Sequence, residues 1–378
     1  MSVEIRDHLP GRDIGDFLRA GHAVFRDDPY WVAPLSFEMK QRLDPRKNPL
    51  FERADVILFT ARRDGRIVGR MSATVDREWQ RHWNDKTGFF GFFDTNDDPE
   101  VARALFDRAE AWLRARGVNH ILGPMSLYSN DEIGILVDGF EHPPSLMMAH
   151  SRRWQAGLAE ACGYHKLTDL FCWRFEGKQE VPKRARAAWE AVSAMPEVKL
   201  RSIDMKRLHE ELRMIVDIYN ENWSGKSLFV PTTQREVEKM AEDMSLVLDP
   251  DIAFVAEVDG KPAGMCIMVP NINEAIRDLG GRLLPLNWIK LLWRVKVKHP
   301  RSTRLILLGV REEVRKNVKR YGGLSAAMYV EVARRGVAKG YEWGELSWTR
   351  EDDAPINLGI RAMGAKIYKR YRMFEKTV

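Results

Sequence analysis

The stretch RLILLGV (304–310), followed by KRYGG (319–323) and a helical pattern that ends at Gly340, decides the fold of this chain. The apolar run predicts a buried strand, and the glycine pair after it lets a ligand approach the backbone closely. The helix that follows presents unpaired N–H groups and the positive end of its dipole. Basic residues flank this point: Arg315, Lys316, Lys319 and Arg320. Strand, basic loop and helix in this order predict a phosphate or pyrophosphate site, and a basic loop before an ordinary helix is the alternative.

Two hairpins with the same pattern, one in each half of the chain, extend the prediction outward. Their sequences are VILFTARRDGRIVGRM (56–71) and IAFVAEVDGKPAGM (252–265). An Asp-Gly pair between apolar strands is the strongest short hairpin signal. In both hairpins a second glycine, Gly69 or Gly264, follows the turn glycine after four residues.

The elements after the hairpins repeat as well. Each hairpin is followed by a strand, a helix that ends in glycine, another strand, a second helix and a final strand. Asp98 and Pro99 begin the first of these helices with an N-cap and a proline at the first helical position. The shared order predicts an α/β protein with mixed sheets, built from two similar domains in tandem, 1–176 and 177–378. The predicted strand, helix and strand are 88–93, 99–116 and 121–122 in the first half, and 305–310, 324–339 and 343–348 in the second.

Composition limits the classes of function. The chain has 378 residues, a net charge of +6 and 44% hydrophobic residues, which suits globular domains with an anionic partner. Cys162, Cys172 and Cys266 have no metal-ligand spacing, so we expect no metal and no disulfide framework. The sequence opens without an apolar leader and contains no apolar run long enough to span a bilayer, so we expect a cytoplasmic protein. No recognised motif accompanies the basic residues, so we expect no nucleic-acid partner.

The predicted order of elements resembles the GNAT fold of acyl-CoA-dependent N-acyltransferases. The loop of that family, Gln/Arg-x-x-Gly-x-Gly/Ala, resembles RYGGLS (320–325), in which serine replaces the last small residue. By this resemblance, loop amides hold the pyrophosphate of an acyl-CoA, and Val310 lies at a strand splay where the thioester arm pairs with the backbone. The first half enters its helix through DTNDD (94–98), which is acidic and would repel a pyrophosphate, so only the C-terminal half is expected to bind the donor. The residues implied as donor-binding are Val310, Lys319, Arg320, Tyr321, Gly322, Gly323, Leu324 and Ser325.

Several further segments resemble a bacterial family of tandem GNAT-like proteins that extends to the bacterial ceramide synthases. Members of that kind join an acyl-CoA to the amine of a sphingoid base. The resemblance therefore implies an N-acyltransferase for a long-chain amine, with the first half as a degenerate copy on the acceptor side. The segments are DPYWV (28–32), KNPLFE (47–52), GFFGFF (88–93), NDEIGILVDGF (130–140) and YKRYRMFEK (368–376).

The second half carries an insertion, LGGRLLPLNWIKLLWRVKVKHP (279–300), between its hairpin and its next strand. Apolar residues, including two tryptophans, are interspersed with basic ones, and no acidic residue falls between Arg282 and Lys298. A short, basic, tryptophan-bearing amphipathic segment is typical of a helix that lies on an anionic membrane surface. We therefore expect residues 282–298 to make the protein peripheral on the inner membrane. A helix packed across the two halves is the alternative.

Acyl transfer to an amine needs a base for the amine, stabilisation of an oxyanion and accommodation of the thiolate leaving group. Polar residues directly before an apolar run suggest a pocket rim, and NDE (130–132) has this arrangement. A carboxylate with a raised pKa can act there as general base, with His150 as a further base or relay. Loop capping by the acids and a core histidine are the alternatives. The predicted catalytic residues are Glu132, Asp131, Asn130, His150 and Tyr368.

The proton donor departs from the family pattern. GNAT proteins often place a tyrosine in the last helix to protonate the thiolate, and alignment on Gly364 puts Ile360 at that position. Tyr368 or Tyr371, just beyond, can substitute, and aromatic residues on a closing strand are the alternative. Glu345 lies inside a predicted strand, and its pattern leaves open whether it points into the site or into solvent.

These observations predict an acyl-CoA N-acyltransferase whose acceptor amine lies in a cleft shared with the N-terminal half, near Glu132. Three other functions stay open. The first is acetyl transfer to a soluble amine, and the second is transfer from an aminoacyl-tRNA, which uses the same tandem plan. The third is an acyl-CoA sensor without catalysis, which the isoleucine at position 360 allows.

Overall fold

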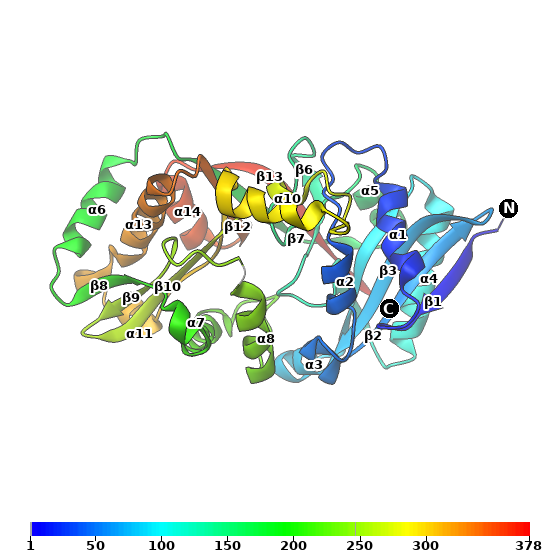
Figure 1. Cartoon of the computed structure of the whole chain (residues 1–378). Coiled ribbons are helices and arrows are strands. Elements are labelled where there is room, and N and C mark those ends of the chain that lie inside the picture. The colour runs from blue at the N-terminus through cyan, green and yellow to red at the C-terminus, as the bar shows by residue number, and fades with distance from the viewer. Residues whose placement is uncertain (1, 246) are drawn as a thin grey trace. The chain divides into compact units, whose positions relative to one another are not determined.

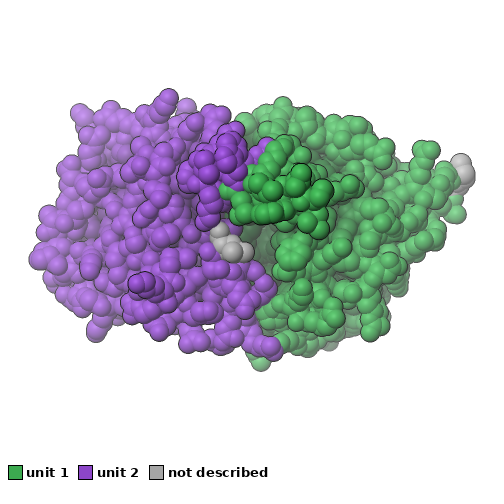
Figure 2. Space-filling model, viewed as in Figure 1, with its two compact units in different colours: residues 1–170, 276–292, 369–378 green, residues 171–275, 293–368 purple. Residues whose placement is uncertain are grey.

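The computed structural model describes residues 2–245 and 247–378 (Figure 1). The chain forms two compact units, which Figure 2 colours separately. Unit 1 contains Met1–Leu170, Ile276–Leu292 and Lys369–Val378, and unit 2 contains Phe171–Ala275 and Trp293–Tyr368. Two segments from the second half of the chain thus belong to unit 1, and the linear domain ranges 1–176 and 177–378 stay a prediction.

Unit 1 is built on a mixed sheet. Its elements in chain order are β1 (Glu4–His8), α1 (Gly15–Val24), α2 (Ser36–Arg42), η1 (Pro49–Glu52), β2 (Ala54–Arg63), β3 (Arg66–Asp76), α3 (Arg77–Trp83), β4 (Thr87–Thr95), α4 (Pro99–Arg114), β5 (His120–Gly123), β6 (Ile135–Asp138) and α5 (Gln155–Ala161). The strands follow the order β1-β2-β3-β4-β5, with β4 and β5 parallel and the other neighbours antiparallel. Alternate residues of β2 face opposite sides of the sheet: Phe59 belongs to the core with α4, and Leu58 to the core with α1.

Unit 2 repeats this plan. Its elements are α6 (Lys183–Ser193), β8 (Val198–Ser202), η2 (Met205–Arg207), α7 (Leu208–Trp223), α8 (Gln234–Met244), β9 (Ala253–Val258), β10 (Lys261–Pro270), η3 (Arg294–Lys298), β11 (Ser302–Val310), α11 (Glu312–Lys316), α12 (Val318–Tyr321), α13 (Leu324–Ala338), β12 (Trp343–Arg350) and α14 (Ala354–Ala362). The strands follow the order β12-β11-β10-β9-β8, and only β11 and β12 are parallel among these neighbours. Its core joins α13 to the sheet through Ala327 and Met328, which lie in one buried cluster with Phe254 of β9.

Both predicted hairpins are confirmed. The first is β2 and β3, and the second is β9 and β10. In each Asp-Gly turn both residues have positive φ, 51° and 74° at Asp64 and Gly65, and 51° and 73° at Asp259 and Gly260. This is the backbone that a two-residue turn between twisted strands requires. Together with the helices and strands after them, the hairpins confirm that the two halves of the chain repeat the same order of elements.

Helix α4 confirms a second local prediction, and the basic loop corrects one. Asp98 accepts hydrogen bonds from the N–H groups of Glu100 and Val101, and Pro99 occupies the first turn. The basic segment before α13, expected as a loop, instead folds into the short helices α11 and α12. Its residues Glu312, Val314, Arg315 and Lys316 are all tolerated in helices, and no proline or glycine interrupts it before Gly322.

The closing strands of the two halves are β7 (His165–Glu176) and β13 (Lys366–Thr377), and each contributes residues to both units. Within unit 1, β13 pairs antiparallel with β5, Phe374 opposite Gly123, and also with the short β6. Phe374 is fully buried in the core of unit 1, and Trp173 of β7 is buried in the core of unit 2. The end of the chain therefore completes the sheet that its beginning started.

Two further helices, α9 (Asn273–Ile276) and α10 (Asn287–Trp293), belong to the insertion region. Within the described part of the chain, no helix combines the length and the apolar composition needed to cross a bilayer. Cys162 is half-buried, and His165 is exposed at the start of β7.

Candidate functional site

The parallel strands of unit 2 separate after a short paired stretch. Ser302 to Leu305 of β11 pair with Trp343 to Leu346 of β12, and the register stops there. On its other edge β11 stays paired with β10 up to Val310, which lies opposite Gly264. The edge of β11 that faces β12 is thus open from Ile306 onward. The sequence resemblance predicts a splay for an acyl-CoA arm at this place, and unpaired strand-edge groups are able to form hydrogen bonds with a ligand.

Helix α13 starts at the end of this splay. Its first hydrogen bond runs from the Ala327 N–H to the Gly323 carbonyl at 2.9 Å, so the N–H groups of Leu324, Ser325 and Ala326 have no acceptor within the helix. A Cβ atom at Gly322 would lie 2.5 Å from the carbonyl oxygen of Val318, so only glycine fits there. Unsatisfied N–H groups together with the positive end of the helix dipole are the features that favour an anion at a helix start.

The other residues of the predicted donor loop fall into two classes. Tyr321 and Leu324 bury their side chains in the core of unit 2, so only their backbone is available to a ligand. Lys319 and Arg320 are exposed. Arg320 donates two hydrogen bonds to Glu197 Oε1, at 3.0 and 2.8 Å, which orients its guanidinium at the surface.

Tyr368 lies in unit 2, as the donor loop does, and donates a hydrogen bond to Glu345. Glu345 has no exposed surface, which answers the question that its strand pattern left open. Its other carboxylate oxygen accepts a hydrogen bond from Ser347 at 2.5 Å, and Arg304 lies 3.8 Å away. Glu345 stands one residue before Leu346, the last residue of β12 that pairs with β11. The Tyr368–Glu345 pair therefore lies close to the closed end of the splay.

The predicted acidic group is in unit 1 and is held by an arginine of α2. Arg42 donates a hydrogen bond from Nε to Asp131 Oδ2 at 2.8 Å, and its Nη2 forms an ion pair with Asp131 Oδ1 at 2.7 Å. Glu132 is farther away, with 3.7 Å between Arg42 Nη1 and its Oε1, and its side chain is 28% exposed. Burial raises the pKa of Asp131 to about 7, with Glu132 adding to the rise and Arg42 opposing it. Asn130 lies half-buried in the same turn.

A second buried ion pair adjoins this group and was missed by the sequence analysis. Arg70 of β3 donates to Asp94 of β4 at 2.6 Å, and both side chains are about one-tenth exposed. The ring of Phe92 lies 5.0 Å from the guanidinium carbon of Arg42 and 5.5 Å from that of Arg70. Burial raises the pKa of Asp94, and Glu132 adds to that rise. Arginine within the apolar run IVGRMSA (67–73) was the signal that could have revealed this pair.

Asp94 therefore does not belong to a solvated acidic entrance, as its place in DTNDD (94–98) suggested. It lies inside the buried strand β4, whereas Asp98 caps α4 and forms an ion pair with Arg63 at 2.7 Å. The splay of unit 1 is also closed. A Cβ atom at Gly91 would lie 1.9 Å from the carbonyl oxygen of Met125, because the chain after β5 packs directly on β4. Unit 1 thus lacks room for a donor arm at this position.

The remaining predicted residues have separate surroundings. His150 lies in unit 1, and its Nε2 is 3.2 Å from Asp28, while its buried Nδ1 has no hydrogen-bond partner among residues 2–245 and 247–378. Burial lowers the pKa of His150, although Asp28 opposes this shift. Tyr371, the other tyrosine considered as proton donor, is fully buried and donates to the Ala149 carbonyl at 2.8 Å, which is a structural contact.

Two relatives match nearly the whole chain in sequence, although no family model matches it. Protein YghO of Escherichia coli (strain K12) is 36% identical over 375 residues, which are 99% of this chain and 95% of that protein. The bacterial ceramide synthase of Caulobacter vibrioides is 38% identical over 355 residues, 93% of this chain and 91% of the relative.

Solved structures show the same fold at low identity. A tandem GNAT protein from the clavulanic acid biosynthesis pathway aligns with a TM-score of 0.58 and 13% identity over 100% of this chain and 98% of its own. A GCN5-related N-acetyltransferase from Sphaerobacter thermophilus aligns with a TM-score of 0.56 and 15% identity over 99% and 95% of the two chains. Sequence and fold agree: this chain belongs to the bacterial family of tandem GNAT-like acyl-CoA N-acyltransferases that includes the ceramide synthase of Caulobacter vibrioides.

Proposed function

We propose that this protein transfers a long-chain acyl group from acyl-CoA to the amine of a sphingoid base, which gives a (dihydro)ceramide. The observation that carries the proposal is the 38% identity to a ceramide synthase over 93% of the chain. The family establishes N-acyl transfer as the reaction. The lipid nature of the acceptor is our proposal. Attack of the neutral amine on the thioester forms the amide bond, releases the thiolate of CoA and frees one proton from the amine.

In this proposal unit 2 holds the donor. The free N–H groups of Leu324 and Ser325, at the start of α13, bind the pyrophosphate, with Lys319 and Arg320 as exposed counter-charges. The open edge of β11 leading to Val310 pairs with the amide groups of the CoA arm. Acyl transfer of this kind needs no protein nucleophile. The thiol of Cys266 is not suited to be one, because burial raises its pKa.

Tyr368 is our candidate to protonate the departing thiolate. Its hydroxyl lies beside the closed end of the splay, and it hydrogen-bonds to Glu345, a carboxylate that Ser347 and Arg304 hold in place. We expect Tyr368→Phe to lower kcat by about a hundredfold, which is within the usual range for loss of a general acid, with little change in CoA affinity. Tyr371→Phe is the matched control, because that hydroxyl donates to the backbone carbonyl of Ala149.

Glu132 is our candidate for the base that accepts the proton of the amine. Asp131 has both carboxylate oxygens engaged by Arg42, whereas Glu132 is more exposed and is not in direct hydrogen-bond contact with that arginine. Glu132→Gln should therefore lower kcat without lowering the melting temperature. Asp131→Asn should lower both, since it removes the partner of a buried arginine. Unchanged turnover in Glu132→Gln would remove this residue from the mechanism.

The insertion supports a lipid acceptor. It exposes large apolar side chains that a protein surface normally covers, among them Leu284, Leu286 and Trp288, with 78%, 67% and 47% of their surface accessible. Lys290 of α10, which pairs with Asp278 at 2.5 Å, adds a positive charge to the same segment. A tryptophan and leucines beside lysines and arginines suit the boundary of an anionic bilayer, where a sphingoid base resides.

The test is a mass-spectrometric assay of the purified full-length protein with a panel of acyl-CoA donors from C2 to C18. A sphingoid base and a soluble polyamine serve as acceptors. N-acylated base that forms with long-chain donors supports the proposal. Acetylated polyamine without acylated base would keep the family assignment and refute the lipid acceptor, and CoA binding without any product would favour a sensor.

A further inference from the structure

Unit 1 contains a large open cavity that the proposed acyl transfer does not use. Its volume is about 1380 Å³, and all of its lining residues belong to unit 1. The walls come from α1 and the turn after it, from the hairpin of β2 and β3, and from the segments before α4 and α5. The start of the insertion, together with Asp278 directly before it, supplies the remaining wall, up to Arg282.

The walls are strongly basic. Six arginines line the cavity, against three aspartates, so the lining carries an excess of three positive charges. We call this cavity the arginine pocket, after Arg19, Arg26, Arg62, Arg66, Arg152 and Arg282. Burial lowers the pKa of His22 at its wall, and the positive charges of Arg70 and Arg282 lower it further. One of the aspartates, Asp278, is already paired with Lys290 at 2.5 Å.

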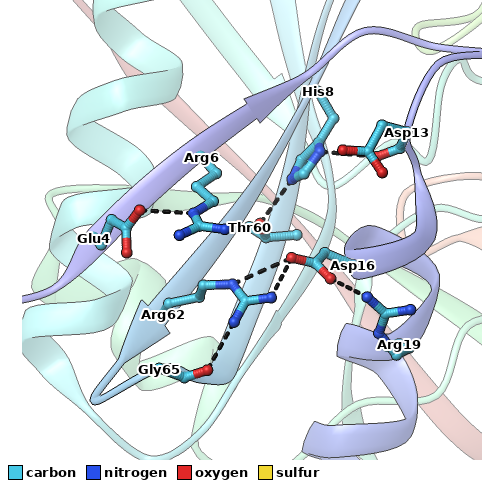
Figure 3. Close-up of polar contacts among 9 residues, drawn as sticks. All are labelled: Glu4, Arg6, His8, Asp13, Asp16, Arg19, Thr60, Arg62 and Gly65. Atoms are coloured by element: carbon cyan, nitrogen blue, oxygen red, sulfur yellow. Dashed lines mark hydrogen bonds and ion pairs between the residues drawn. The ribbon is translucent and has the colours of Figure 1, made fainter.

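Three of the arginines are fixed in place by carboxylates behind the wall. Asp16 of α1 receives hydrogen bonds from both Arg62 and Arg19, and Arg62 also donates to the Gly65 carbonyl at 2.7 Å (Figure 3). Arg152 donates to Asp28 at 3.3 Å and to the Val24 carbonyl at 3.0 Å. One carboxylate thus serves two arginines, and it leaves part of their hydrogen-bonding capacity for a ligand.

The other three arginines have no such partner. Arg26, Arg66 and Arg282 are exposed, and within residues 2–245 and 247–378 their guanidinium groups make no hydrogen bond or ion pair. They come from the turn after α1, from the start of β3 and from the insertion. Convergence of unpaired arginines from three distant parts of the sequence on one cavity is the arrangement that binds phosphate oxygens in proteins.

The pocket also has an apolar side. Ile67, Val68, Trp154 and Leu279 line it together with the arginines. From Arg282 the chain continues directly into the exposed apolar residues Leu284 and Leu286. A ligand that fits both surfaces carries a phosphate and an apolar part.

We propose that the arginine pocket is a second anion site, separate from the donor loop, which binds the phosphate of an amphipathic phosphate ester such as an anionic phospholipid headgroup. The site needs no chemistry of its own. A phosphate-bearing ligand in the arginine pocket would be bound by unit 1 whichever amine the protein acylates. An experiment that refutes the arginine pocket therefore leaves the proposed sphingoid-base acceptor untouched, and the reverse also holds.

The test compares two charge-matched triple variants of the full-length protein. Arg26→Gln/Arg66→Gln/Arg282→Gln removes the unpaired arginines of the pocket. Arg12→Gln/Lys40→Gln/Lys86→Gln removes three exposed, unpartnered charges elsewhere in unit 1. Both variants should keep the melting temperature of the wild type, because none of these side chains has a hydrogen-bond partner among the residues that the structure describes.

Binding is measured with phosphatidylcholine vesicles, with and without phosphatidylglycerol, and by calorimetry with glycerol 1-phosphate. The calorimetry uses the Ser325→Asp background, so that the donor loop does not contribute. We expect the pocket variant to lose at least tenfold in affinity for phosphatidylglycerol vesicles and the control variant to stay within twofold.

Each outcome decides the proposal. Pocket-dependent binding of vesicles supports a lipid headgroup, and pocket-dependent binding of glycerol 1-phosphate without vesicle binding supports a soluble phosphate ester at the same site. Wild-type affinity of the pocket variant for both probes would overturn the proposal. An equal loss in the control variant would overturn it too, because that result shows attraction by net charge alone.

Discussion

Ser325→Asp places a negative charge where we expect the pyrophosphate of the donor. Ser325 is half-buried in the first turn of α13, whose first three N–H groups have no intrahelical acceptor. An acidic residue in a first helical turn stabilises the free protein by about 0.3–1 kcal/mol through the helix dipole. One unit charge roughly 5 Å from another, at an effective dielectric constant of about 20, costs about 3 kcal/mol. The substitution should therefore weaken CoA binding more than about a hundredfold, while the melting temperature stays level or rises.

Isothermal titration of CoA into the full-length protein measures this effect, and Ser325→Asn is the neutral control of similar size. The control should bind within about fivefold of the wild type, which corresponds to about 1 kcal/mol. The defect of Ser325→Asp should shrink as salt is added, because ions screen partly exposed charges. Gly323→Asp supplies a second site, since a Cβ atom there meets only Ala188 and Val192 at ordinary contact distances of 3.5 and 3.6 Å or more. Wild-type affinity in both aspartate variants, with both proteins folded, would refute the donor loop.

Three further changes test other parts of the structure. Gly91→Ala should destabilise the protein by about 3 kcal/mol or more, or prevent folding, because its Cβ overpacks against the backbone. Gly157→Ala, whose Cβ meets nothing within 4 Å, is the control. Urea unfolding of both variants measures the change in the free energy of unfolding. Arg42→Met should lower the free energy of unfolding by about 3–5 kcal/mol at pH 8 in the same urea assay, since it leaves the buried carboxylate of Asp131 unpaired. The loss of stability should be smaller at pH 5, because burial raises the pKa of Asp131 to about 7 and the neutral carboxyl needs no charged partner. The stabilising contribution of protonated Asp131 is complete below about pH 4 and is lost as the pH rises through 7. Leu286→Glu should weaken binding to phosphatidylglycerol vesicles by about tenfold without a change in melting temperature. The reason is that burying a leucine in the bilayer boundary contributes about 1.5–3 kcal/mol. Vesicle binding equal to that of the wild type would place the insertion away from the membrane.

Local chemistry made much of the fold predictable. The Asp-Gly turns require positive φ at both residues, and the Asp98-Pro99 pair satisfies the first N–H groups of α4, so neighbouring residues alone determine these features. Equally short sequence patterns predict helix α13 and the glycine pair before it. Each of these elements would form in the same way in many different tertiary settings, which is why sequence periodicity identifies them.

The pairing of the closing strands was not predictable in this way. Phe374 pairs with Gly123, and Trp173 is buried in unit 2 although it precedes the expected boundary. An alternating apolar pattern shows that β7 and β13 are strands, but it contains nothing about which edge each will join. The polar cluster of unit 1 was hidden for the same reason, because Arg42 and Arg70 reach their carboxylates across 89 and 24 residues of sequence.

The two halves of the chain differ at the place where we infer the donor site. In unit 2 the strands separate after Leu305, and the helix behind them begins with glycine and free N–H groups. In unit 1 the equivalent gap is filled where Met125 packs on Gly91, and the equivalent helix start is already occupied by the carboxylate of Asp98. A carboxylate that satisfies those N–H groups leaves none for a phosphate and also repels one. The phosphate-binding capacity that we infer for unit 1 therefore cannot come from its helix start, and it has to come from arginine side chains instead.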